Sequence, residues 1–254
     1  MTQKVQIDIS DITQTFFSFR DDVYIQRESM LEMNISKYTS FSNFLEMLNG
    51  SIRINNRTTF SDKSEIGEYS DKRFKFFHFL PAIKGLKPSK NDLLRWKNED
   101  EQLSLAKYVY ASSWSSNPDE DYLMWQAYAT RGIGVKINTT IKEFLLALKL
   151  ENCVLVCAEV CYENVPKRTS FERFFLKGKE YKAEREIRFC ILPKNIDTTK
   201  KRISINIESD FIKSVTLSPF EPRLILDMCR ETIQKVKPQL QIHSSKILYG
   251  KSDL

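Results

Sequence analysis

Glycine and proline are scarce in this chain of 254 residues, which contains seven Gly and eight Pro. Collagen-like, low-complexity and long disordered segments are rich in these residues, so we exclude those classes. No run approaches 18 apolar residues, and we expect no membrane span. The N-terminal residues carry acids and lack a basic segment followed by a long apolar stretch, so we expect no signal peptide and a cytoplasmic location.

Histidine is almost absent: the chain has only His78 and His243. A Ser-His-Asp triad or a histidine-rich metal site would need one of them. The Phe-Phe-His-Phe context favours a packed core position for His78, and His243 follows Ile242 in a strand-like segment. No G-x-G-x-x-G follows a predicted strand, and no G-x-x-x-x-G-K-S/T loop occurs. These common catalytic and nucleotide-binding signatures are therefore missing.

The five cysteines are an odd number in a chain with no predicted secretory signal, which favours reduced thiols. Cys153, Cys157 and Cys161 are four residues apart in a Val-rich run, a spacing that predicts three thiols on one face of a strand. Successive sulfurs would then lie about 13 Å apart, too far to share one metal ion. We expect buried, inert thiols and no metal site.

The net charge of +6 is concentrated in one segment. Residues 166–202 contain 12 Lys or Arg and five Asp or Glu, a net charge of +7. Such a segment would attract an anionic ligand or a nucleic acid. A solvated, Lys-rich helix and loop explains the same charge equally well.

The chain has ample material for a core, with 41% hydrophobic residues, 17 Phe and 10 Tyr. Short strands and unequal helices, without regular βαβ alternation, predict an α+β fold with a mixed, mostly antiparallel sheet and flanking helices. We expect an N-terminal arm over residues 1–34 and a single domain over residues 35–254.

Local patterns predict the individual elements. Helices are expected at 40–50, 91–107, 119–129, 140–150, 169–182 and 221–236. Strands are expected at 51–55, 107–116, 133–138, 153–162, 184–192, 202–207, 211–217 and 240–248. A polar loop over 56–72 is long enough to be functional.

The most informative segment is Ala-Glu-Arg-Glu-Ile-Arg at 183–188, which runs into an apolar stretch. If it is extended, side chains alternate between faces with a period of two. Glu184, Glu186 and Arg188 then share one face, and Ile187 and Phe189 point to the other. The pattern predicts two carboxylates and a guanidinium held rigidly together.

Several segments, in order, resemble a bacterial domain-of-unknown-function family, number 2971. The matching pieces are Lys37-Tyr38 with Ser40, Phe60-Ser61-Asp62 with Glu65, Trp114-Ser115, Met124-Trp125-x-x-Tyr128, Gly132-x-Gly134, Val160-x-Tyr162 and Tyr181-x-x-Glu184-x-Glu186-x-Arg188. They span about residues 35–250. The family usually has a proline after the position of Asp62, and this chain does not.

The order of these motifs is also similar to that of the ADP-ribosyltransferase superfamily. There, a basic or aromatic residue on a first strand precedes a Ser-x-Ser strand end and a Glu-x-Glu strand start. The resemblance implies a split sheet, NAD as substrate and no metal. A fixed carboxylate would stabilise the positive charge that develops on the ribose as nicotinamide leaves.

By this resemblance, Glu186 would be the catalytic carboxylate and Glu184 its partner, which positions the acceptor. Ser113 and Ser115 would orient the ribose, with Trp114 on the opposite face. The further cofactor-binding candidates are Lys37 or Tyr38 in place of the usual first-strand Arg or His, Trp125, Tyr128 and Arg188. The acceptor would be nucleic acid or protein, and the role that of a bacterial toxin or phage-defence effector.

Other interpretations remain open. Glu184, Glu186 and Arg188 would equally form a structural salt-bridge ladder on a sheet face. Trp125 and Tyr128 have the spacing of core residues on a short helix. A non-enzymatic nucleic-acid-binding or sensor module would use the basic 166–202 segment, including Lys177, Lys179 and Lys182. An NAD hydrolase would share the role of Glu186, and the sequence does not predict an oligomeric state.

Overall fold

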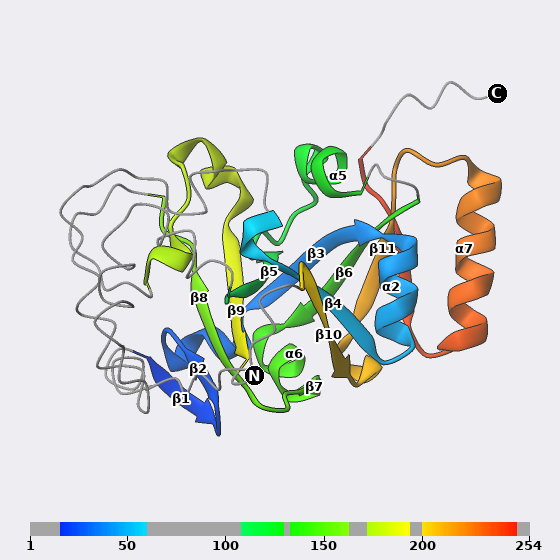
Figure 1. The fold of residues 1–254 in the computed structure, drawn as a ribbon. Helices are drawn as coiled ribbons and strands as arrows, with labels where there is room; N and C mark the ends of the chain where they lie inside the picture. The colour runs from blue at the N-terminus through cyan, green and yellow to red at the C-terminus, as the bar shows by residue number, and fades with distance from the viewer. Residues whose placement is uncertain (1–15, 60–107, 130–132, 163–171, 194–199, 248–254) are drawn as a thin grey trace, which may run out of the picture. The chain divides into compact units, whose positions relative to one another are not determined.

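The computed structural model describes residues 16–59, 108–129, 133–162, 172–193 and 200–247. The chain divides into two compact units, and Figure 1 labels the helices and strands of both. Unit 1 comprises residues 1–30, 54–113 and 150–203, and unit 2 comprises residues 31–53, 114–149 and 204–254. Three of the five boundaries fall within strands, namely β4 (Ser51–Asn56), β5 (Tyr110–Ser115) and β10 (Arg202–Ile207).

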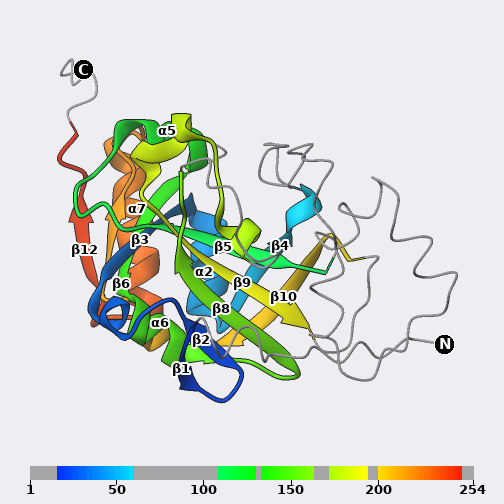
Figure 2. The ribbon, with the colours of Figure 1, turned by 90° about the vertical axis from the view of Figure 1, so that its left-hand side faces the viewer.

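The strands of unit 1 lie side by side in Figure 2. β1 (Phe17–Arg20) pairs antiparallel with β2 (Val23–Ile25), which pairs parallel with β8 (Cys153–Glu159). β8 pairs antiparallel with β9 (Glu186–Pro193), which is followed by β5. This order makes β9 an interior strand.

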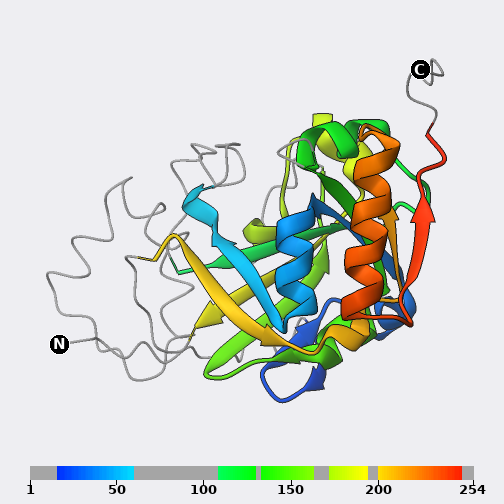
Figure 3. The ribbon, with the colours of Figure 1, turned by 90° about the vertical axis from the view of Figure 1, so that its right-hand side faces the viewer.

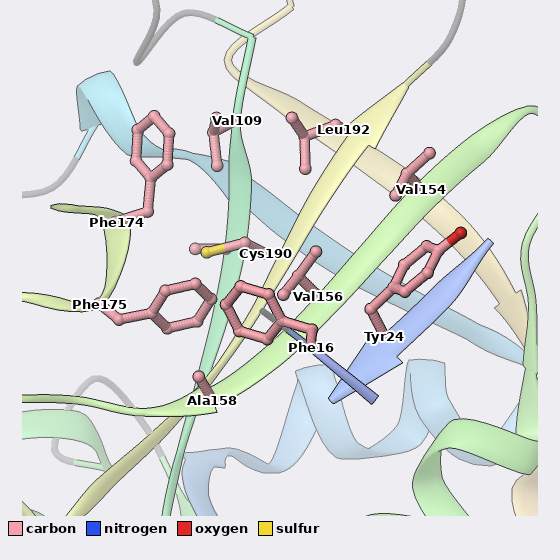
Figure 4. Close-up of a cluster of buried hydrophobic side chains, with 11 residues drawn as sticks. Phe16, Tyr24, Val109, Val154, Val156, Ala158, Phe174, Phe175, Cys190 and Leu192 are labelled. Carbon is pink, nitrogen blue, oxygen red and sulfur yellow. The ribbon is translucent and has the colours of Figure 1, made fainter. Parts of the chain in front are cut away.

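A cluster of buried side chains packs on one face of β8 and β9 (Figure 4). Val154 faces Leu192 and Val156 faces Cys190 across the two strands. Phe174 and Phe175 come from a 3-10 turn at Glu172–Phe175 and complete this part of the core. Glu186 and Arg188 occupy the same face of β9 as Cys190 and Leu192, because side chains alternate along a strand. The charged pair therefore continues an apolar core.

Unit 2 is built around β3 (Asn34–Ser40) and β6 (Gly134–Thr140), which are antiparallel over their full lengths. β11 (Ser214–Leu217) pairs antiparallel with β6, and β12 (Gln241–Ser244) pairs parallel with β11. On the other side of β3, Ser36 pairs with Ser115 of β5.

Figure 3 looks onto two helices of unit 2, α2 (Phe41–Leu48) and α7 (Arg223–Val236). α2 contacts β3 and β6, and α6 (Ile141–Ala147) contacts β6. α5 (Tyr122–Tyr128) contacts β3. The start of α2 follows from its sequence, because the Ser40 hydroxyl accepts the Asn43 backbone N–H at 3.3 Å, a standard N-cap. Gly50 has φ +86, the left-handed backbone that glycine favours after a helix.

These helices and mostly antiparallel strands form an α+β fold, as the sequence predicts. The segment expected as an N-terminal arm contains β1 and β2, which belong to the sheet of unit 1. The prediction of one domain over residues 35–254 stays a prediction, as does the likeness to the ADP-ribosyltransferase fold.

Most expected elements within the described residues are present with shifted ends, but one prediction is wrong. Instead of a helix at 169–182, the described part of this segment forms two short 3-10 turns, Glu172–Phe175 and Lys179–Glu184. The Cys161 N–H donates to the Phe175 carbonyl, and the Lys177 N–H donates to the Cys161 carbonyl. These two hydrogen bonds join the segment after the first turn to the segment after β8. The helix at 91–107, the polar loop beyond residue 59, His78 and Gly132 lie outside the described residues.

Two smaller predictions also need correction. The helix expected to end at residue 150 ends at Ala147, and a two-residue strand, β7 (Leu148–Lys149), follows it. Cys161 lies beyond the end of β8, so the three cysteines do not share one continuous strand. Cys157 and Cys190 are buried, and burial raises the pKa of both thiols.

Candidate functional site

A backbone turn sets the positions of the two predicted glutamates. The 3-10 turn Lys179–Glu184 ends at Arg185, which has a left-handed backbone with φ 45, and β9 begins at Glu186. A non-glycine residue with positive φ is uncommon and redirects the chain. Glu184 therefore precedes the strand, and the expectation that it shares a strand face with Glu186 is wrong. Glu186 and Arg188 do share a face.

Glu186 and Arg188 form a buried ion pair with two parallel hydrogen bonds. Arg188 Nε donates to Glu186 Oε1 at 2.6 Å, and Nη2 donates to Oε2 at 2.9 Å. The side chains are 0% and 2% exposed for Arg188 and Glu186. This bidentate geometry is the strongest form of an arginine–carboxylate contact. It fixes the carboxylate relative to its own strand.

Lys177 links the two glutamates. Its Nζ lies 2.8 Å from Glu184 Oε2 and 3.3 Å from Glu186 Oε2, and it sits 4.6 Å from the centre of the Tyr181 ring. The Glu184 side chain is 16% exposed, whereas that of Lys177 is 5% exposed. The structure thus brings Glu184 and Glu186 together through a shared ammonium group.

Two hydroxyl groups complete the surroundings of Glu186. The Ser113 side chain hydrogen-bonds the Glu186 carboxylate. The backbone N–H of Glu186 donates to Tyr162 Oη at 2.8 Å. Ser113 and Glu186, distant in sequence, therefore lie beside each other within unit 1.

The electrostatic balance keeps Glu186 ionised. Burial alone would raise the pKa of Glu186, but the charge and hydrogen bonds of Arg188, together with Lys177 and Ser113, lower this pKa to about 2. Burial raises the pKa of Tyr162 to about 12, although its backbone hydrogen bond opposes this. At neutral pH the cluster therefore presents an anionic Glu186 and a protonated phenol.

Three residues in or next to the group of side chains around Glu186 were not predicted as site residues. Lys177 was considered only as part of the basic segment, and Tyr162 only as part of the matched Val160-x-Tyr162 pattern. Arg57, which is 0% exposed, donates from Nη1 to the Phe174 carbonyl at 2.6 Å. Its position at the start of a polar segment gave no signal of burial.

Unit 2 contains the remaining predicted site residues. Tyr38 contacts Trp125 edge-on, with ring centres 5.0 Å apart, and Asp121 N–H donates to Tyr38 Oη at 3.0 Å. Trp125 is fully buried and its Nε1 donates to Glu120 Oε2 at 3.3 Å. These contacts agree with a packing role for Trp125.

The faces of the strands separate the other candidates in unit 2. Ser115 is buried and points to the same side as Ser36, its partner on β3, and as Tyr38 two residues along. Lys37 points to the opposite side, where its Nζ lies 5.6 Å from the centre of the Trp114 ring. Tyr128 on α5 is 46% exposed. Only Tyr38 of the two first-strand candidates thus lies on the Ser115 side.

The cluster in unit 1 is compatible with two roles. An ionised carboxylate beside a serine is what ribose stabilisation needs. Two-pronged binding by Arg188 is equally what a structural ion pair needs, although the pair is buried and not on a solvated sheet face. Arg188 neutralises Glu186 in both cases.

A search of protein-family models found no match to this chain, and a search of curated proteins also found none. Within the described residues, no helix is both long and apolar enough to cross a membrane. The same residues contain no cluster of three or more His, Cys, Asp or Glu side chains arranged to hold a metal ion.

Proposed function

We propose that this chain is an ADP-ribosyltransferase-like enzyme that acts on NAD in the cytoplasm. Glu186 would stabilise the ribose as the bond between C1′ and the nicotinamide nitrogen breaks. Nicotinamide would leave with the bonding electron pair, and a nucleophile on nucleic acid or protein would bind C1′ and lose a proton. The observation that carries the proposal is the hydrogen bond between Ser113 and an ionised Glu186.

The contacts of Glu186 suggest how the carboxylate would reach the ribose. Its contact with Lys177, at 3.3 Å, is longer than its two contacts with Arg188, at 2.6 and 2.9 Å. We propose that a ribose hydroxyl replaces Lys177 at Oε2, while Arg188 keeps the carboxylate in place. Lys177 would then remain bound to Glu184, its closer partner at 2.8 Å.

The two glutamates would have different roles because their surroundings differ. Glu184 is the more exposed carboxylate and is better placed to contact an acceptor from solution. Tyr162 would add a hydrogen bond to the substrate, since its oxygen accepts from Glu186 N–H and its own proton stays available over the physiological pH range.

The test is nicotinamide release from NAD by the full chain, followed by chromatography, with nucleic acid or cell lysate as acceptor. We expect Glu186→Gln to lower the rate by about 100-fold or more, the usual effect of removing one preorganised electrostatic group. Glu208→Gln is the matched control, because the exposed Glu208 side chain pairs with an exposed Lys149. Circular dichroism and a melting curve would show whether each variant folds.

The products distinguish the related reactions. Label on nucleic acid or protein would identify a transferase, and free ADP-ribose would identify an NAD hydrolase. No loss of NAD with the wild-type chain across these acceptors would remove both forms of the proposal. A toxin or phage-defence role would follow only from transfer to a cellular acceptor.

A second candidate function is nucleic-acid binding without catalysis, which one surface favours. Lys179, Lys182 and Arg185 are exposed on the same 3-10 turn and its cap. Lys177 does not belong to this surface, contrary to the prediction, because its ammonium group is buried between two carboxylates.

Binding of this second kind would weaken steeply as salt concentration rises. Replacing Lys179, Lys182 and Arg185 with Ala should reduce the salt dependence, whereas Glu186→Gln should leave binding unchanged. Fluorescence anisotropy with labelled DNA and RNA at several salt concentrations would measure both effects. Binding that does not respond to salt would contradict this candidate.

A further inference from the structure

One side of the unit 2 sheet carries polar side chains in register across adjacent strands. Ser36 on β3 lies between Ser115 on β5 and Asn138 on β6. In the next row, Lys136 on β6 lies between Tyr38 on β3 and Thr216 on β11. Residues two apart on a strand point to the same side, so the two rows share one face.

Most of this polar face is buried, and Asn138 at its edge is half-buried. The exposed fractions are 3% for Ser36, 6% for Tyr38, 4% for Lys136, 6% for Thr216 and 1% for Ser115. The polar face of an antiparallel sheet is commonly solvated, and buried polar groups normally have hydrogen-bond partners. The face therefore needs an explanation beyond the stability of the sheet.

Of the side chains on this face, Lys136 has the largest free-energy cost of burial, because it carries a charge. Its Nζ donates to the Asp119 backbone carbonyl at 3.2 Å and lies 5.6 Å from the centre of the Tyr38 ring. Among the described residues, no carboxylate forms an ion pair with it. The nearby Glu120 accepts from Trp125 and Lys246, at 3.3 and 3.0 Å, and from the Ser245 hydroxyl. Burial lowers the pKa of Lys136, and the negative charges of Glu120 and Asp119 oppose this only in part.

A second group on the face is also unsatisfied. The Ser36 hydroxyl is buried and makes no hydrogen bond within the described residues. Such a hydroxyl destabilises the fold, because it has lost its hydrogen bonds to water. Tyr38 Oη accepts from Asp121 N–H, which leaves its own proton for another acceptor. Burial raises the pKa of Tyr38 to about 12, so this proton is retained at neutral pH.

We propose that this face, around Lys136, binds the phosphate group of a small-molecule ligand. Lys136 would supply the positive charge, and Ser36 and Tyr38 would donate hydroxyl hydrogen bonds. A phosphate carries enough acceptor oxygens to use all three donors, and lysine serves as a compact charge in many phosphate sites. The proposal concerns unit 2 only and does not depend on NAD cleavage or on Glu186.

The proposed site makes opposite predictions for stability and binding. Lys136→Met should raise the melting temperature of the ligand-free chain, because it removes a buried charge with no carboxylate partner. It should also weaken binding by about tenfold to 100-fold, the usual effect of one charge-assisted hydrogen bond. A lysine that serves only the fold predicts instead a lower melting temperature.

The experiment is calorimetric titration of the full chain with inorganic pyrophosphate, together with melting curves for each variant. Lys142→Met is the matched control, because Lys142 is a half-exposed lysine in a long surface contact with Glu32. Ser36→Ala should weaken binding without lowering the melting temperature. Glu186→Gln should bind as the wild type does, which separates this proposal from the proposed function.

Three results would overturn the proposal. They are no heat of binding with millimolar pyrophosphate, equal binding by Lys136→Met and the wild type, and a lower melting temperature for Lys136→Met. Acetate serves as a further probe. Acetate binding as tight as that of pyrophosphate would identify a carboxylate site and would also overturn the assignment to phosphate.

Discussion

Arg57 and Arg188 donate hydrogen bonds to the same atom, the backbone carbonyl oxygen of Phe174, at 2.6 and 2.8 Å. Both guanidinium groups are 0% exposed. Because Arg188 also binds Glu186 through two hydrogen bonds, the carbonyl connects the 3-10 turn Glu172–Phe175 to the carboxylate. The ion-pair cluster is thus fixed by β9 and by this turn together.

Removing Arg188 should destabilise the fold strongly. Arg188→Met leaves the carboxylate of Glu186 buried without its main partner, and we expect a loss of about 3–5 kcal/mol in the free energy of unfolding, measured in urea. Arg223→Met is the control, since the Arg223 side chain is 94% exposed and lies 3.8 Å from Asp227 in a surface contact. Equal losses in the two variants would contradict the role given to Arg188.

Stability should fall in acid through Glu186. The pKa of Glu186 is lowered from 4.5 to about 2, so the unfolded state binds more protons between these values. The ion pair therefore contributes fully above pH 4.5, and its contribution of about 3 kcal/mol is lost as the pH falls toward 2. Urea unfolding at pH 6, 4 and 3 would measure this. The free energy of unfolding should fall more steeply with decreasing pH for the wild type than for Glu186→Gln. An equal pH dependence in the two proteins would contradict the lowered pKa of Glu186.

Lys177 should help to keep Glu186 ionised. In Lys177→Met the pKa of Glu186 should rise, because Lys177 is one of the cations that lower it. Carbon NMR titration of the glutamate carboxyl groups would detect the shift. The control is Lys179→Met, because Lys179 is exposed on the neighbouring turn. An unchanged titration of Glu186 in Lys177→Met would show that Lys177 does not contribute to its ionisation.

Glu120 should hold the end of the described chain against α5. Its Oε1 accepts the Lys246 backbone N–H at 3.0 Å, and Ile247 packs near Tyr38 and Trp125. Glu120→Gln replaces one acceptor oxygen by an NH2 group, so we expect the Lys246 amide to exchange with deuterium roughly tenfold faster. Exposed Glu231→Gln is the control. Unchanged exchange at Lys246 would argue against this contact.

Local sequence signals located most of the described elements. Ser40 predicted the start of α2 because a hydroxyl cap acts on an amide three residues away. Alternation predicted that Glu186 and Arg188 share a face of β9. The same reasoning placed Glu184 on that face wrongly, because it assumed a continuous strand and Arg185 has a left-handed backbone.

The residues that surround Glu186 were less predictable than Glu186 itself. Ser113, Glu184, Glu186 and Arg188 do come together in unit 1. Lys177 was assigned to a basic surface, since charge counting does not show which ammonium group is buried between carboxylates. Lys136 had no distinguishing neighbours in the sequence. Its burial depends on its partners Tyr38 and Thr216 across the sheet.

By itself, the sequence indicated most of the helices and strands and which charged residues alternate with apolar ones, because caps and side-chain periodicity act over a few residues. Only the tertiary structure decided that Glu186 is neutralised and enclosed and that Lys136 lacks a carboxylate partner among the described residues. Burial and charge pairing depend on residues far apart in the chain. Those contacts exist only once the strands have paired.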